Sequence, residues 1–322
     1  MLNNKFWQDR AVLVTGGGGF IGSHLVKALV KLKAKVIVLD IAPKLINPIL
    51  STSEIRLVKY FQADISQRQA VQRVFSDQPI SSVFHLAAKP LVETGDIHPE
   101  DVFEANVMGT VHILEAVRRQ TNCSLVLAST AHVYGENQVP LLEEYFPRPS
   151  RPYETSKACA DMIAQTYAIH YCLPVAIARF VNIYGPGDTN LRLVPNTIQL
   201  LMKHQPPVIY DEDVRRDFLY ITDAIGAYLT LGQAVGQKSN HGANIIYNFG
   251  SGHHYSTGQV IDLISQLMGK SDIKPQVCRP ERTTDIKDQY LSVKKAKQFL
   301  GWRAQISLKQ GLKITIDSYQ GK

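Results

Sequence analysis

The sequence predicts an α/β fold, a doubly wound parallel sheet with a smaller, interleaved C-terminal lobe. Short apolar runs alternate with helix-like segments through the first half of the 322-residue chain, which is typical of a parallel sheet covered on both faces. From residue 11 to 25, an apolar run, four glycines and an amphipathic run follow one another. After Tyr184 the alternation gives way to proline- and glycine-rich segments. We therefore place the first domain at 1–184 and the second lobe at 185–322, with an approximate boundary.

The first apolar run begins at Ala11 and leads into four glycines and a helix that is expected to start at Phe20. This arrangement presents backbone N–H groups to a phosphate, and the positive end of the helix favours its negative charge. The spacing fits GxxGxxG when it is counted from Gly16 and GxGxxG when it is counted from Gly17. In either reading, the turn is interpreted as the pyrophosphate site of a dinucleotide in a Rossmann domain.

The second predicted strand, Val36–Leu39, ends at Asp40. A carboxylate at this place can accept hydrogen bonds from both hydroxyls of an adenosine ribose, and it would repel a 2′-phosphate. Ile41 and Ala42 follow it, where an NADP site would favour a basic residue. The predicted cofactor is therefore NAD. The alternative is a glycine-rich turn in another kind of α/β protein, with Asp40 as an ordinary residue at the end of a strand.

Further apolar runs place polar or small residues where their strands end, and ligands bind at the carboxyl ends of parallel strands. Asp64 follows one run and could accept a hydrogen bond from an adenine amino group. The segment HLAA, residues 85–88, ends the next run near the expected cofactor. A later run ends in the hydroxyls of Ser129 and Thr130. The strands are expected at 57–61, 83–86, 125–128 and 175–178, and the helices of the second lobe at 196–203, 223–234, 257–268 and 293–300.

Tyr153 and Lys157 are four residues apart in the segment YETSK, so on a helix they share one face. A neighbouring cation stabilises a phenolate, and it is expected to lower the pKa of Tyr153 so that the tyrosine can take a proton from an alcohol. The hydroxyl of Thr130 could hydrogen-bond the same substrate oxygen. The spacing also arises by chance on amphipathic helices, so this pair alone identifies no reaction.

Taken in register, these segments resemble one family. They are TGGGGFIG, Asp40, HLAA, Asn106 in NVMGT, ASTAHVYG, YETSK, ARFVNIYGPGD, RRDFLYITD and LGW. From about residue 9 to 317 the chain is similar to the extended short-chain dehydrogenases/reductases that act as nucleotide-sugar epimerases and dehydratases. The resemblance implies NAD as cofactor and a nucleotide-diphosphate sugar as substrate. The residues that it implies for cofactor binding are Gly16, Gly19, Phe20, Ile21, Gly22, Asp40, Asp64, Ile65, Leu86, Ala87, Ala88, Tyr153 and Lys157.

The resemblance also implies roles for residues that bind or convert the sugar. Thr130, Tyr153 and Lys157 would be catalytic, and Asn106 would support the backbone of the active site. The substrate-binding positions would be Asn182, Pro195, Tyr210, Arg216 and Arg279. Guanidinium groups bind phosphate oxygens in pairs of hydrogen bonds, so two arginines suit a diphosphate. Each arginine could instead form an ion pair on the surface.

The resemblance implies a homodimer as well, and two predicted helices would form its contact. They span about residues 99–119 and 153–171. The first carries apolar residues on more than one face of a helical wheel, among them Val102, Ile113 and Leu114, and a helix that is apolar on several faces has more than one partner to pack against.

One departure from the family bears on the reaction. The 4,6-dehydratases that the chain resembles carry an acid, or an acid pair, just after the catalytic hydroxyl, where this chain has Ala131 and His132. Dehydration needs a base for the C5 proton and an acid for the C6 hydroxyl, whereas C4 epimerisation needs only Tyr153 and a 4-keto intermediate. Alanine can be neither acid nor base. His132 could serve as one of them, or it could be a spacer that points away.

We therefore expect an NAD-dependent NDP-sugar epimerase, most simply at C4, which does not release a 4-keto-6-deoxy sugar. The first alternative is a 4,6-dehydratase in which His132 or Glu143 replaces the usual acid. A 4-keto-sugar reductase is a further alternative. A regulatory protein that binds NAD is the alternative outside the enzymes, although it would have no need of Tyr153 as a catalytic group.

The composition excludes several other classes of protein. Hydrophobic residues make up 45% of the chain and charged residues 20%, as in ordinary globular domains. No leader sequence and no apolar run of about 18 residues are found, so a cytoplasmic protein without a membrane partner is expected. The four cysteines lack metal-site spacing, so no metal is predicted. The net charge of +7 is spread along the chain, which favours an anionic small substrate over a nucleic acid.

Overall fold

A seven-stranded parallel sheet forms the centre of the computed structural model, which describes residues 4–45, 48–89, 97–190, 192–237, 245–278 and 286–321. Its strand order is β11-β6-β5-β4-β1-β2-β3. The chain moves outward from β1 to β3 and then crosses to β4 on the other side of β1, so the edge between β1 and β4 is a switch point where ligands bind. The predicted doubly wound fold is confirmed. The strands are β1 (Ala11–Thr15), β2 (Lys35–Asp40), β3 (Lys59–Gln62), β4 (Ser82–His85), β5 (Ser124–Thr130), β6 (Val175–Phe180) and β11 (Ile246–Phe249).

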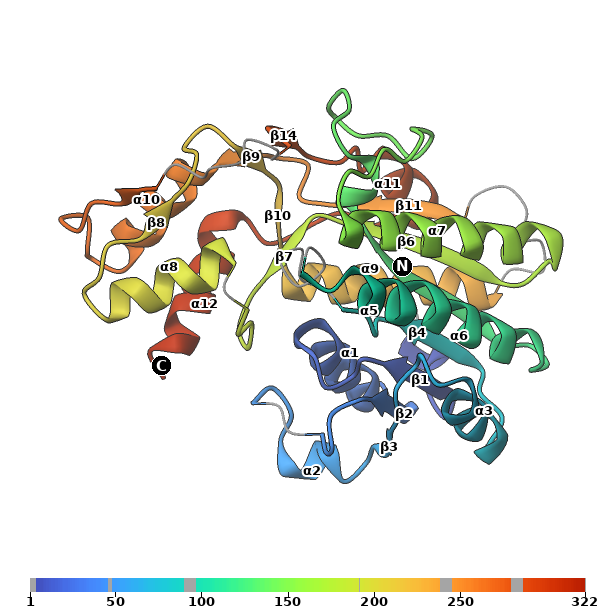
Figure 1. Cartoon of the computed structure of the whole chain (residues 1–322). Helices are drawn as coiled ribbons and strands as arrows, with labels where there is room; N and C mark the ends of the chain where they lie inside the picture. Colours follow the sequence, from blue (N-terminus) through green and yellow to red (C-terminus); the bar gives the residue numbers. More distant parts are fainter. Residues whose placement is uncertain are drawn as a thin grey trace.

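Helices cover both faces of this sheet (Figure 1). The side chains of β1 alternate between two apolar clusters, with Val12 and Val14 in one and Leu13 in the other. Residues of α1 (Phe20–Lys31) and α9 (Ile221–Gln237) complete the first cluster. Residues of α3 (Arg68–Asp77), α6 (Gly109–Arg118) and α7 (Pro152–His170) complete the second. Because both faces are buried, the strands read as continuous apolar runs in the sequence.

The second lobe holds small sheets and short helices, and in Figure 1 its helices α8, α10 and α12 lie on the side of the molecule away from α3 and α6. The chain does not stay in that lobe, because α9 and β11 return to the central sheet. The boundary near residue 184 stays a prediction. The elements are β7 (Asn182–Tyr184), α8 (Leu193–Met202), β8 (Val208–Ile209), β9 (Arg215–Arg216), β10 (Phe218–Tyr220), β12 (Tyr255–Ser256), α10 (Thr257–Leu267), β13 (Gln276–Val277), β14 (Asp288–Gln289), α11 (Lys294–Leu300) and α12 (Leu308–Tyr319).

The predicted helix over 99–119 is divided into three parts. They are α5 (Pro99–Phe103), a π-helical turn η2 (Glu104–Met108) and α6. A π-helical turn is wider than an α-helical one, so it changes the phase between the two halves. Val102, Ile113 and Leu114 are all fully buried, and they therefore give no support to an outward contact. These three residues fall on different faces of a regular helical wheel because the π-helical turn shifts α6 relative to α5.

The remaining short elements are η1 (Asn4–Phe6), α2 (Thr52–Ile55) and η3 (Ala131–Tyr134). Within the described ranges, every helix is too short or too polar to cross a bilayer.

Candidate active site

A cavity of about 680 Å³ opens at the carboxyl edge of the central sheet, between the two lobes. Thr130, His132 and Asn182 form part of its wall. Every residue that was expected to contact NAD lines it as well: Gly16, Gly19, Phe20, Ile21, Gly22, Asp40, Asp64, Ile65, Leu86, Ala87, Ala88, Tyr153 and Lys157. The fold thus brings together segments that are distant in the sequence.

The glycine turn between β1 and α1 is tight at three positions: a Cβ on Gly17 would lie 2.7 Å from Cγ1 of Val38, and Gly16 and Gly22 face the backbone. A Cβ on Gly22 would lie 2.0 Å from the carbonyl oxygen of Gly16, and one on Gly16 would lie 2.8 Å from the backbone nitrogen of Ala87. Gly16 also has a φ of +71°, which favours glycine. Because Gly16, Gly17 and Gly22 are all constrained, both readings of the glycine spacing fit. Gly19 gives α1 no side-chain cap among the described residues, so the helix N-terminus suits an anion.

The carboxylate of Asp40 lies beside this turn and lines the cavity. One of its oxygens, Oδ2, accepts a hydrogen bond of 2.8 Å from the backbone of Gly18, and Oδ1 accepts one of 3.1 Å from Ala42. An ionised carboxylate has about four acceptor positions, so it can still bind ribose hydroxyls. The glycine turn and the carboxylate of Asp40 together fit an adenine dinucleotide that lacks a 2′-phosphate.

Tyr153 and Lys157 lie one turn apart on α7 and both face the cavity. The Nζ of Lys157 donates a hydrogen bond of 2.6 Å to the carbonyl of Ala128 on β5. Burial lowers the pKa of Lys157 to about 8, against the opposing charge of Asp161. Burial raises the pKa of Tyr153 to about 12, although the charge of Arg192 acts in the other direction. The prediction that the pKa of Tyr153 is lowered is therefore wrong for the protein without ligands. Desolvation of the phenolate outweighs the charge of Arg192.

Thr130, Ala131 and His132 follow one another at the end of β5, and their side chains lie in different surroundings. Thr130 accepts a hydrogen bond of 3.3 Å at Oγ1 from the backbone of His132, and this bond caps the short helix η3. Ala131 is fully buried in the core. The His132 side chain keeps 28% of its surface exposed and lines the cavity. Glu143, by contrast, is not among the cavity residues, and its carboxylate accepts a hydrogen bond of 3.0 Å from the backbone of Asn248.

Asn106 has the supporting contacts that were expected of it. Its Oδ1 accepts a hydrogen bond of 2.8 Å from the backbone of Lys89, and its Nδ2 donates to the carbonyl of Lys89 and to Oγ of Ser156. It thereby connects the loop after β4 to α7, close to Lys157.

The predicted substrate residues of the second lobe are more widely spread. Asn182, at the start of β7, lines the cavity. Pro195 is buried in α8, Tyr210 is 61% exposed, and Arg216 lies on β9. None of these three is among the cavity residues, and their roles stay predictions. Arg279 lies outside the described residues.

Several residues of the cavity wall were not singled out from the sequence, and Arg192 and Tyr228 are two of them. Arg192 precedes α8, pairs with Asp188 at 2.7 Å, and has its guanidinium carbon 5.9 Å from the centre of the Phe20 ring. Its place between the segment GPGD and the helix expected at 196–203 was a usable signal, since the helix begins at Leu193. Tyr228 lies in the middle of α9. No pattern could have identified it, because it reads as an ordinary core residue of an amphipathic helix.

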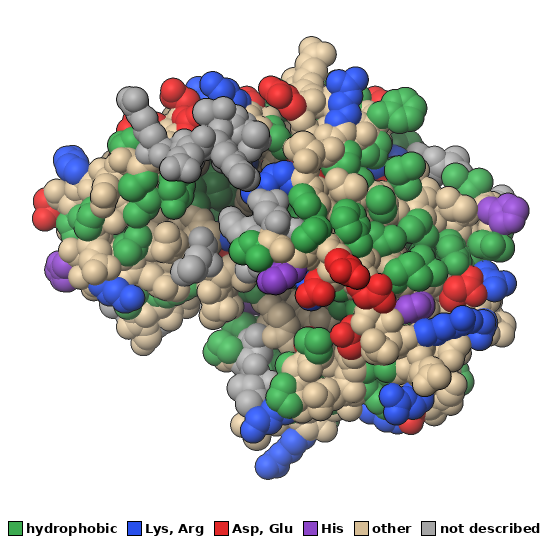
Figure 2. All heavy atoms as spheres, in the orientation of Figure 1, with side chains coloured by type: hydrophobic (Ala, Val, Ile, Leu, Met, Phe, Trp, Pro, Cys, Tyr) green, Lys and Arg blue, Asp and Glu red, His purple; other side chains and the backbone are tan. Residues whose placement is uncertain are grey.

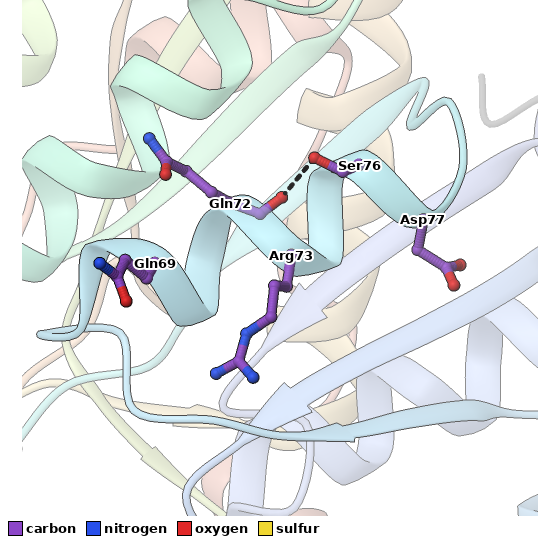
Figure 3. Close-up of a pocket in the computed structure, with 5 residues that line it drawn as sticks. All are labelled: Gln69, Gln72, Arg73, Ser76 and Asp77. Atoms are coloured by element: carbon purple, nitrogen blue, oxygen red, sulfur yellow. Dashed lines mark hydrogen bonds between the residues drawn. The ribbon is translucent and has the colours of Figure 1, made fainter.

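A second hollow, on the outside of α3, is not a comparable site. Its five lining residues all belong to that helix, and Figure 3 shows their side chains spread along its surface. Lys59 on β3 forms an ion pair with Asp77, which leaves that carboxylate engaged, and the hydrogen bond drawn in the figure, from Ser76 Oγ to the carbonyl of Gln72, stays within the helix. Among the described residues, no group of His, Cys, Asp and Glu could hold a metal ion.

Comparison with known proteins identifies the family of the chain. Residues 13–315 match the family model described as GDP-mannose 4,6 dehydratase. The dTDP-D-glucose 4,6-dehydratase of Homo sapiens is 32% identical over 97% of this chain and 90% of its own length. The structure of UDP-glucose 4-epimerase from Thermotoga maritima with UDP-glucose has a TM-score of 0.88 and 29% identity, over 97% of this chain and 99% of that one. The UDP-glucose 4-epimerase of Thermus thermophilus, solved with NAD, has a TM-score of 0.84 and 31% identity over the same shares.

Proposed function

Because the chain belongs to the GDP-mannose 4,6-dehydratase family, within the extended short-chain dehydrogenases/reductases, we propose that it is an NAD-dependent NDP-sugar epimerase that acts at C4. The observation that carries this proposal is the shared cavity. The glycine turn, the Asp40 carboxylate and the set Thr130, Tyr153 and Lys157 all line it. A pure NAD sensor would need the first two features but not the third.

The cofactor site follows from the fit described above. Backbone amides at the start of α1 would bind the pyrophosphate, Asp40 the adenosine ribose, and Lys157 the nicotinamide ribose. When bound there, NAD supplies the acceptor and donor of the hydride at C4 of the sugar. The structure of the Thermus thermophilus relative with NAD supports the same choice of cofactor.

Tyr153 would take the proton of the 4-hydroxyl as that carbon is oxidised. Its pKa of about 12 in the protein alone means that the phenolate needs further stabilisation during the reaction. The nearby cations of Lys157 and Arg192 are the groups of this chain that can provide it. The hydroxyl of Thr130 would hydrogen-bond the same sugar oxygen. Epimerisation follows when the 4-keto sugar presents its other face before it is reduced.

Two observations favour the epimerase over the dehydratase. Ala131 is buried in the core and offers no acid, and Glu143 is absent from the described cavity wall. One observation keeps the dehydratase as a second candidate, since His132 does line the cavity. A histidine there could take the place of the usual acid or base.

The product distinguishes the two candidates. The protein is incubated with NAD and with UDP-, CDP-, GDP- and dTDP-hexoses in turn, and each sugar is followed by NMR. The epimerase proposal expects two interconverting hexoses. A C6 methyl signal would overturn it in favour of the dehydratase, and the loss of that signal in His132→Ala would assign the missing group.

We also propose that the protein is a homodimer through α6 and α7. Figure 2 shows hydrophobic side chains gathered over the face that these helices form. Exposed apolar residues on this part of the chain include Met108, Met162 and Ile169. They replace Val102, Ile113 and Leu114 as the support for this contact, since a patch of exposed apolar residues indicates an interaction surface.

A further inference from the structure

The ring of His132 has one shielded side and one side toward the cavity. Its Nδ1 atom is buried and has no hydrogen-bond partner at normal geometry within the described part of the chain. Since 28% of the side chain is nevertheless exposed, the accessible part of the ring is the part that carries Nε2 and the carbon atoms. Any proton transfer between His132 and a bound sugar would therefore use Nε2.

The carboxylate of Glu154 lies beside the shielded side of the ring. Its Oε1 lies 3.4 Å from Nδ1 of His132, slightly beyond a normal hydrogen bond. Catalytic hydrogen bonds are often long in the absence of substrate and shorten when it binds. The side chain of Glu154 is 5% exposed, so water does not compete for this contact.

The other oxygen of Glu154 is already held in place. Oε2 accepts hydrogen bonds from the backbone of Ser150 at 3.0 Å, from Oγ of Ser150 at 3.2 Å and from the backbone of Arg151 at 3.3 Å. Burial opposes ionisation of Glu154, but the contacts from His132 and Ser150 outweigh it and hold the pKa of the carboxyl below its usual range. A charged carboxylate with one fixed oxygen thus presents its second oxygen to the histidine.

We propose that Glu154 is a positioning residue that fixes the tautomer of His132, with the proton on Nδ1 and the lone pair of Nε2 facing the cavity. Its carboxylate has no proton to donate, so it can only accept one from Nδ1. A neutral histidine held in this way is a proton acceptor toward the sugar. The pair forms a second acid–base group beside Tyr153.

The role of this pair in the reaction rests on the proposed function, because its substrate is the 4-keto sugar. Once C4 is a carbonyl, the proton on C5 becomes acidic. The C5–H bond breaks, the proton moves to Nε2, and the electron pair forms an enolate on the C4 oxygen. Return of a proton from Nε2 restores the 4-keto sugar. In an epimerase this exchange leaves the product unchanged apart from the isotope at C5, and in a dehydratase it precedes loss of the C6 hydroxyl.

Glu154→Gln tests the tautomer in the whole protein without any substrate. The fixed donors at Ser150 and Arg151 hold the amide oxygen at the Oε2 position, which leaves the NH₂ group beside Nδ1. The neutral ring must then carry its proton on Nε2. Glutamine can also accept the hydrogen bond from the backbone of Arg151 at the start of α7, so the variant is expected to fold.

The readout is the ¹⁵N chemical shifts of His132, assigned by the signals that disappear in His132→Gln. Wild type should show the proton on Nδ1, and Glu154→Gln should show it on Nε2. Glu136→Gln is the matched control, because the same change is made at an exposed carboxylate four residues from His132, and its spectrum should equal the wild type. A tautomer that is unchanged by Glu154→Gln would overturn the proposal.

Isotope exchange tests the role in the reaction. In deuterated water, wild type should place deuterium at C5 of a sugar that it oxidises. Glu154→Gln should lower the ratio of this exchange to oxidation at C4 about 100-fold or more, which is the usual loss for a missing base. The ratio is used because the charge of Glu154 also acts on Tyr153. Oxidation at C4 without deuterium at C5 would overturn the inference and leave the proposed function intact. If no nucleotide sugar is oxidised, the proposed function fails. The ¹⁵N measurement of the His132 tautomer then tests the inference without a substrate.

Discussion

At the residue scale, the phenol of Tyr153 is the group on which turnover should depend. Tyr153→Phe removes only the ionisable oxygen, so NAD affinity should stay close to the wild-type value. Turnover should fall below a tenth of the wild-type rate, which corresponds to more than about 1.4 kcal/mol of barrier. Steady-state kinetics and an NAD titration measure the two effects. A variant that retains more than a tenth of the rate would contradict the role of Tyr153 as the base.

Asp40 should decide between the two dinucleotides. Wild type is expected to bind NAD more tightly than NADP, because a carboxylate repels a 2′-phosphate. The pair of changes Asp40→Ala and Ile41→Arg should reverse this preference by replacing a negative group with a positive one. Fluorescence titration of each cofactor measures the ratio. Equal affinities in the wild type would refute the assignment.

Lys157 predicts a dependence of stability on pH. Its pKa is lowered from 10.5 to about 8 by burial, so between these values the unfolded chain holds a proton that the folded chain has lost. The contribution of this group to the free energy of unfolding therefore rises as the pH rises through that window, by up to about 3 kcal/mol. Urea unfolding at pH 8 and 10 should show this rise in wild type relative to Lys157→Met. A constant difference between the two proteins would contradict it.

At the scale of elements, a buried ion pair fastens α7 to the central sheet. Asp161 on α7 accepts hydrogen bonds of 2.8 and 2.9 Å from Arg179 on β6, and one of 2.9 Å from Oγ of Ser129 on β5. Both charged side chains are almost fully buried. Asp161→Asn leaves Arg179 without its counter-charge and should cost about 3–5 kcal/mol, whereas Ser129→Ala should cost about 1 kcal/mol. Urea unfolding measures the loss of unfolding free energy in each variant. Equal losses in the two variants would contradict the role of the ion pair.

At the scale of the whole molecule, the exposed apolar face of α6 and α7 predicts a dimer in solution. Light scattering at micromolar concentration should give twice the chain mass of 35.9 kDa. Met162→Asp and Ile169→Asp together should shift the mass toward that of one chain, because charges are costly in an apolar interface. Ile314→Asp, at an exposed apolar residue of α12, is the control and should leave the mass unchanged. A monomeric wild type would contradict the proposal.

The sequence by itself determined the sheet and the glycine turn, and its resemblance to a known family implied the residues expected around NAD. The sheet and the turn depend on patterns that are local in the chain. Apolar runs report strands that are buried on both faces, glycines report backbone that approaches closely, and parallel strands place their ends at one edge whatever the details of packing. This is why Asp40 could be placed at the ligand-binding edge from the sequence pattern, whereas Asp64 and Tyr153 were placed there by the resemblance.

Only the tertiary structure decided which neighbours act on those residues. The pKa of Tyr153 rises because desolvation depends on everything packed around it. Ala131 faces the core and His132 the cavity because η3 turns the chain directly after β5. Arg192 and Tyr228 reach the cavity from elements that the sequence does not place beside β5. Such contacts join residues far apart in the chain, and their distances and burial are set by packing, which no local pattern records.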